Sequence, residues 1–186
     1  YGDFEAYPNR DSLKYRDEYG LEDIQTIFRG TLRRPGFCNA WKLLVQPGLT
    51  DDSITLENSE NMTYRDILNT FLAYETNISV EKKLCKYLRI DEGSEEMKKL
   101  IWLGLFDKKK IGLPNASPAK ILQHLLEQKW QMDQQDKDMI VMQHQFEYEI
   151  QGKQNKLISS MVTIGDNAIH TAMAKTVGLP LGIAVK

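Results

Sequence analysis

Residues 142–150 read MQHQFEYEI, in which apolar or ring-bearing side chains alternate with polar ones. A period of two residues is typical of a β-strand with one face buried and the other in water. Turn-forming residues from Gly152 to Asn155 follow, and the chain then becomes rich in strand-forming side chains again. The segments 139–151 and 156–164 therefore predict a β-hairpin.

Upstream of this hairpin the period changes to that of an α-helix. Thr63 and Asp66 form a capping pattern, and Ser117 with Pro118 is a typical helix start. Apolar side chains recur at helical spacing in four stripes, at 67–72, 80–88, 97–103 and 121–130. These stripes predict a small helical core, and none of them has the character of a cofactor site.

The N-terminal part predicts a further strand over 24–33, because β-branched and aromatic residues are frequent there. Arg29, Thr31 and Arg33 would project together from one face of this strand, since side chains alternate between faces. Pro35 and Gly36 end the strand, and 37–45 is expected to be a helix.

Shorter helices are expected near both ends of the chain. One covers about 12–19, and the other covers about 171–177, where Gly178 and Pro180 would interrupt it. The chain opens without an initiator Met and closes inside an apolar run, so we interpret it as a fragment of a longer protein.

Composition narrows the class of partner. The chain has 186 residues, 41% of them hydrophobic, with 24 basic and 26 acidic residues and a formal charge of −2. Such a balance provides no overall field for nucleic acid, and no apolar run is long enough for a membrane span. We expect a cytoplasmic protein whose partner is a small molecule or another protein surface.

Metal and nucleotide sites are not expected in this chain. The cysteines and histidines lack the local spacing of metal ligands, and His144 is expected as a core residue on the inward face of its strand. No GxGxxG sequence follows a predicted strand, so no cofactor-binding residue is assigned. The cysteines and histidines of the chain are Cys38, Cys85, His124, His144 and His170.

Longer motifs identify a family. YPNRDSLKYRDEYGLEDIQTIFRGTLRRPGF at 7–37, DKDMIVMQHQFEYEI at 136–150 and IGDNAIHTAMAKTVGLPLGIAVK at 164–186 resemble the C-terminal part of saccharopine dehydrogenases, the glutamate-forming enzymes of lysine metabolism. SENMTYRDILNTF at 59–71 and ASPAKILQHLLEQKW at 116–130 are similar to the bacterial branch of that family. The resemblance runs nearly from end to end.

The resemblance implies an α+β fold. A mixed β-sheet forms a substrate-binding domain with helices on one side, and an all-helical subdomain is inserted into it. By this resemblance 1–50 and 133–186 belong to the mixed sheet and 51–132 to the helical insertion. The sheet would contain the strands predicted at 24–33, 139–151 and 156–164.

The resemblance also implies a function. Family members oxidise the CH–NH group of saccharopine with NAD or NADP, which a Rossmann domain absent from this chain would bind. Arg10, Thr31, Leu32 and Arg33 would contact the substrate carboxylates, because a guanidinium fork matches a carboxylate in bidentate fashion. Arg10 and Arg33 are expected to converge on one anion site. No catalytic residue is assigned, and the fragment alone would be inactive.

Other charged residues are weaker candidates. Arg29 could bind substrate or form a structural ion pair. Arg34 is a further weak candidate for substrate binding, and Lys175 is expected on a helix surface. Asp136 and Asp138 would share one exposed face beside Lys137, with no partner His or metal. Two alternatives stay open: a non-catalytic dimerisation or binding module of the same fold, and a related reductase of carboxylated imines such as carboxynorspermidine dehydrogenase. A homodimer is compatible with each.

Overall fold

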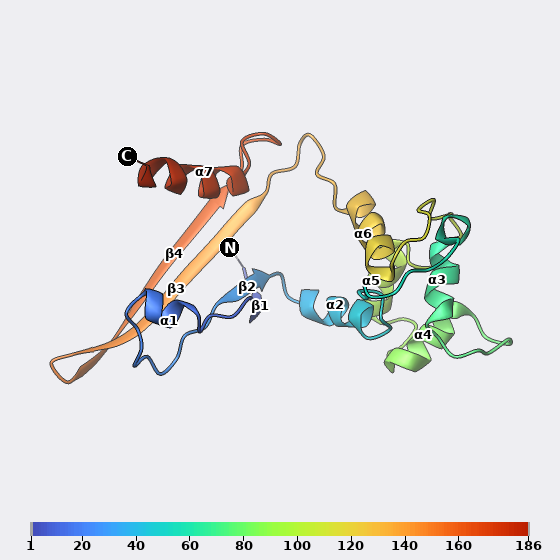
Figure 1. Cartoon of the computed structure of the whole chain (residues 1–186), viewed down its shortest axis with the longest axis horizontal. Helices are drawn as coiled ribbons and strands as arrows, with labels where there is room; N and C mark the ends of the chain where they lie inside the picture. The colour runs from blue at the N-terminus through green and yellow to red at the C-terminus, as the bar shows by residue number, and fades with distance from the viewer. Residues whose placement is uncertain (1, 186) are drawn as a thin grey trace. The chain divides into compact units, whose positions relative to one another are not determined.

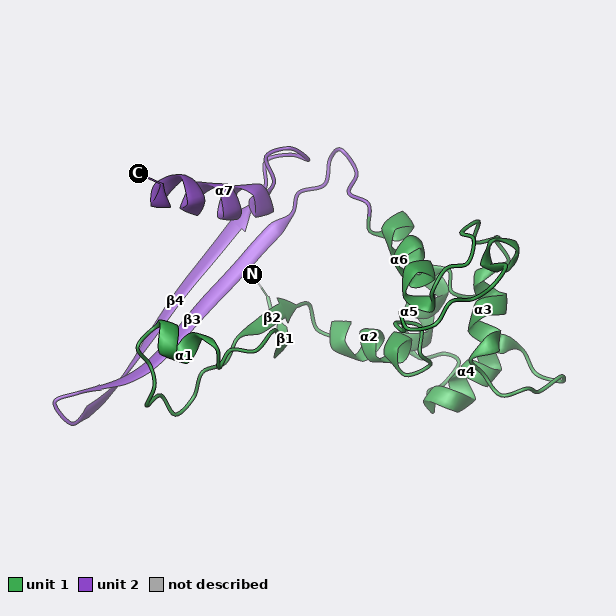
Figure 2. Cartoon of the chain, in the orientation of Figure 1, with its two compact units in different colours: residues 1–130 green, residues 131–186 purple. Residues whose placement is uncertain are grey.

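The computed structural model describes residues 2–185 and consists of two compact units, one ending at Trp130 and one beginning at Gln131 (Figures 1 and 2). The first unit contains β1 (Glu5–Pro8), α1 (Tyr15–Glu18), β2 (Gly30–Arg33), α2 (Phe37–Val45), η1 (Ser59–Asn61), α3 (Tyr64–Thr70), α4 (Val80–Leu88), α5 (Glu95–Leu103) and α6 (Pro118–Lys129). The second contains β3 (Met139–Ile150), β4 (Lys153–Ile164) and α7 (Ala172–Ala184).

The α+β class is confirmed. The domain division predicted from the sequence groups the chain differently and stays a prediction.

The described strands pair as two separate antiparallel sheets, β1 with β2 and β3 with β4. The sequence predicts one mixed sheet, but neither described ladder has a parallel neighbour. The expected strand over 24–33 is also too long, since only Gly30–Arg33 is extended in a ladder. Its partner β1 ends at Pro8, which lies opposite Gly30.

The hairpin is confirmed, with a tighter turn than expected. Ile150 pairs directly with Lys153, so only Gln151 and Gly152 form the connection. Both have positive φ, at 53° and 75°, as a type I′ turn requires. His144, expected in the core, is exposed and stacks on Phe146 at 6.0 Å. A two-stranded ladder has no second layer of its own to bury that face.

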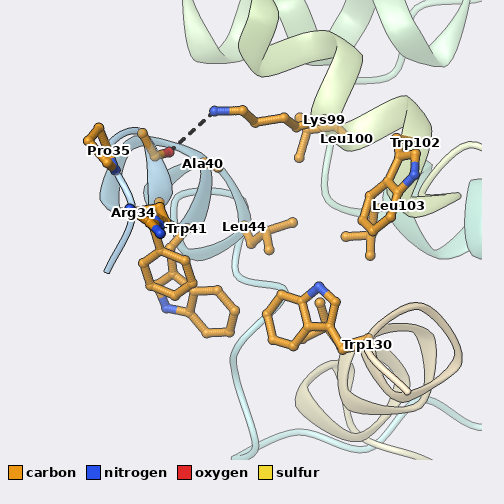
Figure 3. A pocket seen from close by; sticks show the side chains of 13 residues that line it. Arg34, Pro35, Ala40, Trp41, Leu44, Lys99, Leu100, Trp102, Leu103 and Trp130 are labelled. Carbon is orange, nitrogen blue, oxygen red and sulfur yellow. Dashed lines mark hydrogen bonds between the residues drawn. The ribbon is translucent and has the colours of Figure 1, made fainter. Parts of the chain in front are cut away.

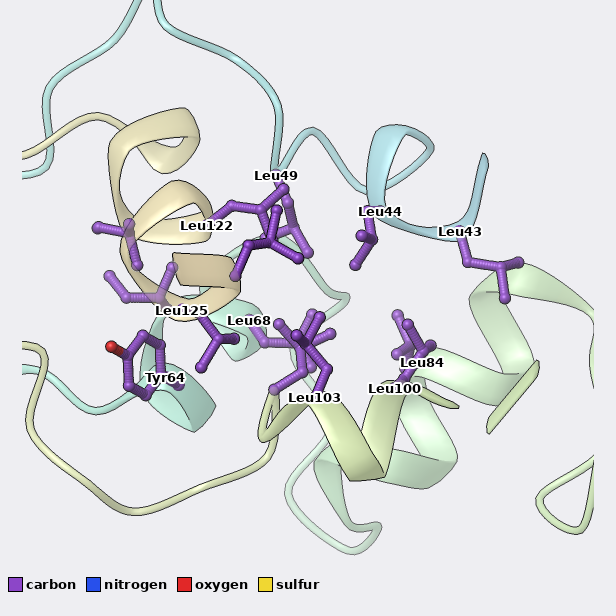
Figure 4. Close-up of a cluster of buried hydrophobic side chains, with 14 of the residues drawn as sticks. Leu43, Leu44, Leu49, Tyr64, Leu68, Leu84, Leu100, Leu103, Leu122 and Leu125 are labelled. Carbon is purple, nitrogen blue, oxygen red and sulfur yellow. The ribbon is translucent and has the colours of Figure 1, made fainter. Parts of the chain in front are cut away.

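The helical middle forms the hydrophobic core of the first unit (Figure 4). Leu68 and Leu84 are fully buried, and Met97 and Leu100 nearly so. The helix starts follow the sequence signals: Thr63 and Asp66 form a complete capping box, and the Ser117 side chain accepts from Lys120 N with Pro118 in the first turn. Local caps and an apolar stripe reinforce each other here.

Helix α7 is longer than its sequence signals suggest. It runs through Gly178 and Pro180 to Ala184, so the predicted interruption is wrong. A proline inside a helix removes one backbone donor, and the helix continues here despite that loss. In the described part of the chain, no helix is long and apolar enough to cross a membrane.

A bidentate ion pair fastens α3 to α4. Both guanidinium Nη atoms of Arg65 donate to the Glu81 carboxylate, the second at 2.8 Å. Hydrogen bonding from Arg65 lowers the pKa of Glu81 to about 2 from 4.5. Because the folded pKa is depressed, the pair's contribution to stability is present above pH 4.5 and is lost as the pH falls toward 2.

We therefore expect Glu81→Gln to flatten the acid side of the stability profile. Urea unfolding followed by helical circular dichroism should show a smaller loss of unfolding free energy than in the wild type as the pH falls from 4.5 toward 2, the window between the two pKa values. Glu57→Gln, at an exposed position, is the control. Identical pH profiles for wild type and Glu81→Gln would contradict this assignment.

Candidate substrate-binding site

The sheet of β1 and β2 places four chemically useful side chains on one face. Glu5 lies opposite Arg33, and Tyr7 lies opposite Thr31, in the antiparallel register. Directly opposed residues share a face, and residues two apart on a strand do so as well. This pairing gathers a carboxylate, a phenol, a hydroxyl and a guanidinium group on one side of the sheet.

The Arg33 guanidinium is held by two aromatic rings. Its Cζ lies 5.9 Å from the centroid of the Tyr7 ring and 5.3 Å from that of Phe37. The two rings are nearly parallel, 6.2 Å apart, and Phe37 stacks in turn on Trp41 at 5.9 Å. Each cation–π contact at such an exposed site is worth about 0.5–1 kcal/mol. The rings restrict the guanidinium while the Arg33 side chain stays exposed.

Thr31 is oriented by Asn9, whose Nδ2 donates to Thr31 Oγ1 at 2.8 Å. Asn9 N also donates to Arg29 O at 2.9 Å, so the antiparallel pairing continues past the proline. Gly30 lies between these contacts, and a Cβ there would meet the Phe28 ring at 2.9 Å and Tyr7 O at 3.2 Å. The close approach of the two chains favours glycine at this position.

Glu5 joins the sheet to the helical cluster. Its carboxylate accepts from Gly36 N at 3.1 Å and from Cys38 N at 2.5 Å, at the start of α2. These backbone hydrogen bonds, the one from Cys38 foremost, hold the pKa of Glu5 below its usual value. A helix N-terminus carries partial positive charge and unpaired N–H groups, which a carboxylate satisfies. Phe37, the ring beneath Arg33, begins this helix.

The backbones of Arg10 and Arg33 lie at opposite ends of the β1–β2 pairing, and the expected convergence of their side chains on one anion site stays a prediction. Arg33 lies at the Glu5 end of the ladder, whereas Arg10 follows Asn9 at the other end. Four residues of strand, roughly 13 Å, separate the Asn9 level from the Arg33 level. Arg10 is exposed and has a left-handed backbone with φ 64°, uncommon for a residue with a Cβ. The antiparallel return is present, but its register separates the two arginines.

The remaining predicted residues fall in different places. Leu32 is half-buried on the opposite face of β2, and Arg29 is exposed just outside the strand. The Arg34 guanidinium lies over the Phe4 ring at 4.8 Å. Lys175, in the second unit, forms an ion pair with Asp166, with 2.8 Å between Lys175 Nζ and Asp166 Oδ1.

Asp138 has partners that the sequence does not reveal. Its two carboxylate oxygens accept from Ala172 N at 2.6 Å and Met173 N at 2.8 Å, at the N-terminus of α7. Asp138 is half-buried, whereas the sequence predicts it on an exposed face. Asp138 instead fastens α7 to the end of the hairpin.

Sequence reasoning missed the supporting residues Glu5, Tyr7 and Asn9. Their spacing of two residues is a strand signal, and it matches the alternation of Arg29, Thr31 and Arg33 across the ladder. The run is too short to predict a strand by itself, because Pro8 interrupts it. Only the pairing with β2 makes the pattern visible.

The described chain has an α+β fold, and the face of β1 and β2 carries an exposed arginine supported by two aromatic rings. The family model for the saccharopine dehydrogenase C-terminal domain matches residues 1–186. The chain belongs to this family.

Individual relatives agree with that assignment. The chain is 31% identical over 192 residues to saccharopine dehydrogenase [NADP(+), L-glutamate-forming] of Schizosaccharomyces pombe, covering 98% of this chain and 42% of that protein. It is 33% identical over 188 residues to the mitochondrial alpha-aminoadipic semialdehyde synthase of Rattus norvegicus, covering 98% of this chain and 20% of the relative. These relatives are eukaryotic, and the expected closeness to the bacterial branch stays a prediction.

The fold has a solved counterpart. The apo, histidine-tagged saccharopine dehydrogenase (L-Glu forming) from Saccharomyces cerevisiae superposes with a TM-score of 0.81 at 30% identity. The match covers 98% of this chain and 42% of the solved chain. The present chain thus spans less than half the length of these relatives.

We expect Glu5→Ala to loosen the start of α2, where Phe37 supports the Arg33 guanidinium. Hydrogen exchange at the Gly36 and Cys38 amides should become faster, because the carboxylate that accepts from both is removed. Glu5→Gln, which keeps one acceptor oxygen, should lie between Glu5→Ala and the wild type. Glu57→Ala is the matched control. Unchanged exchange at both amides in Glu5→Ala would show that the contact does not hold the helix start.

Proposed function

We propose that this chain is the substrate-binding portion of a saccharopine dehydrogenase. The observation that carries the proposal is the face of β1 and β2, where Arg33 is supported by Tyr7 and Phe37 beside the Asn9-oriented Thr31. A preorganised guanidinium loses less conformational entropy when it binds a carboxylate. More of the binding free energy is therefore available for orienting the substrate. Membership of the family and its named relatives support the same substrate class.

The full-length protein would oxidise the CH–NH group of saccharopine. Saccharopine, water and the oxidised nucleotide give glutamate, aminoadipate semialdehyde, the reduced nucleotide and a proton. NAD or NADP would supply the hydride acceptor from a Rossmann domain outside this chain, and the names of the fungal relatives favour NADP. The residues of this chain would bind and orient the substrate, and no proton-transfer role is assigned to them.

Saccharopine has three carboxylates, and the separation of the two arginines suits a long anion. Arg33 would hold one carboxylate by its fork, with Thr31 and the backbone at Leu32 beside it. Arg10 would hold another at the far end of the ladder. Each arginine thereby has its own carboxylate position, and all four predicted residues keep a role in the proposal.

The homodimer and the cytoplasmic location stay proposals. Exposed apolar side chains of α7 in the second unit, among them Leu179 and Ile183, would suit contact with another protein surface. The non-catalytic binding module and the carboxynorspermidine-type reductase remain the alternatives. Steady-state assays of the full-length protein with saccharopine and with carboxynorspermidine would separate all three.

In the full-length enzyme, we expect Arg33→Ala and Arg10→Ala each to raise KM for saccharopine about ten- to a hundred-fold, as loss of about 1.5–3 kcal/mol per charge-assisted pair predicts. Arg33→Lys should rescue little, because a point charge cannot reproduce the fork. The effects of the two alanine variants should multiply in the double variant, since each arginine holds its own carboxylate.

Lys42→Ala, which removes an exposed cation from α2, is the control and should leave KM unchanged. Wild-type KM and kcat in Arg33→Ala would refute the site. A double variant no worse than either single variant would refute the separation into two carboxylate positions. The isolated 186-residue chain should reduce neither NAD nor NADP with saccharopine above a buffer blank.

A further inference from the structure

A cavity of about 290 Å³ lies between α2, α5 and α6 in the first unit (Figure 3). Leu44, Leu100, Leu103 and Leu126 line it with aliphatic side chains from all three helices. Arg33, Thr31 and Arg10 are not among its lining residues, whereas Phe37, whose ring supports Arg33, is one of them. Its volume is at the lower end of the range for small-molecule sites, which fits a body of one or two fused rings.

Aromatic side chains surround this aliphatic part. Phe37 and Trp41 stack at an interplanar angle of 8°, with Trp102 and Trp130 on the α5 and α6 sides (Figure 3). Trp102 is 59% exposed and Trp130 is 54% exposed, although both are large and mainly apolar. Aromatic rings attract other flat rings by offset stacking and edge-to-face contact. The lining therefore favours a flat aromatic body.

The charge at the rim has one sign. Lys99 and Arg34 are lining residues, and no Asp or Glu is among them. Lys99 Nζ is 3.5 Å from Gly36 O, a long contact for a group with three donors (Figure 3). Lys129, beside the cavity, lies over the Trp102 ring at 5.4 Å. A ligand with an anionic group next to its rings would complement this rim.

We propose that the cavity is a binding site for a small aromatic anion, a one- or two-ring body that carries a carboxylate. The rings pack on the aromatic and aliphatic side chains of the lining, and the carboxylate faces Lys99. This site does not depend on the proposed dehydrogenase function, because none of the four proposed substrate-binding residues lines it, although Phe37 contributes to both places.

Isothermal titration of the full-length protein with 2-naphthoate tests the proposal. Binding should saturate at one ligand per chain, and the neutral isostere 2-naphthamide should bind about tenfold more weakly or worse, the cost of one lost charge pair. Lys99→Gln should weaken 2-naphthoate about tenfold and leave 2-naphthamide unchanged. Lys98→Gln is the matched control, since Lys98 pairs with Glu95 and does not line the cavity.

A second variant tests the position of the rings. Ala40→Trp places a large side chain on the lining of α2 and should abolish binding, with circular dichroism confirming that the helices are retained. Absence of saturable binding to the full-length protein overturns the proposal, as does full binding by Ala40→Trp. Equal affinities for 2-naphthoate and 2-naphthamide, or equal losses in Lys98→Gln and Lys99→Gln, overturn the assignment of an anion.

Discussion

The carboxylate of Glu5 at the start of α2 is the contact on which the site depends. It accepts from Gly36 N and Cys38 N, and thereby joins the first strand to the first helix of the core across more than thirty residues of chain. Because Phe37 begins that helix, the same contact places an aromatic ring beneath Arg33. The Glu5 contact therefore links the β1–β2 sheet to the start of α2, and through Phe37 it affects the position of the Arg33 guanidinium.

The helical core supplies rigidity without supplying chemistry to the proposed substrate site. Its buried side chains are almost all aliphatic, and each of the helices α3 to α6 begins at a Ser or Thr cap. Such a cluster can hold α2 firmly, because a close-packed interior has low compressibility and its side chains leave little room for a helix to shift. The Tyr7, Phe37 and Trp41 stack runs from the Arg33 contact to the wall of the aromatic cavity. One ring, Phe37, therefore takes part in both places.

The second unit is organised by different means. Its hairpin has twelve paired residues on each strand, and Asp138 secures α7 to it through two backbone amides. Many of its apolar side chains remain exposed, including Phe146, Ile150 and most of α7. A lone two-stranded ladder has little core of its own. The exposed apolar surface is the main difference between this unit and the leucine-rich first unit.

Local patterns were enough to predict α2 to α6, the caps at Thr63 and Ser117, and the β3–β4 hairpin, because periodicity and capping act over a few residues. The motifs around Arg10 and Arg33 were likewise enough to predict the family. The pairing of β1 with β2, the shortening of β2 to four residues and the distance between Arg10 and Arg33 needed the tertiary structure. Each depends on the register between segments that are far apart in the chain, and periodicity over a few residues carries no information about that register.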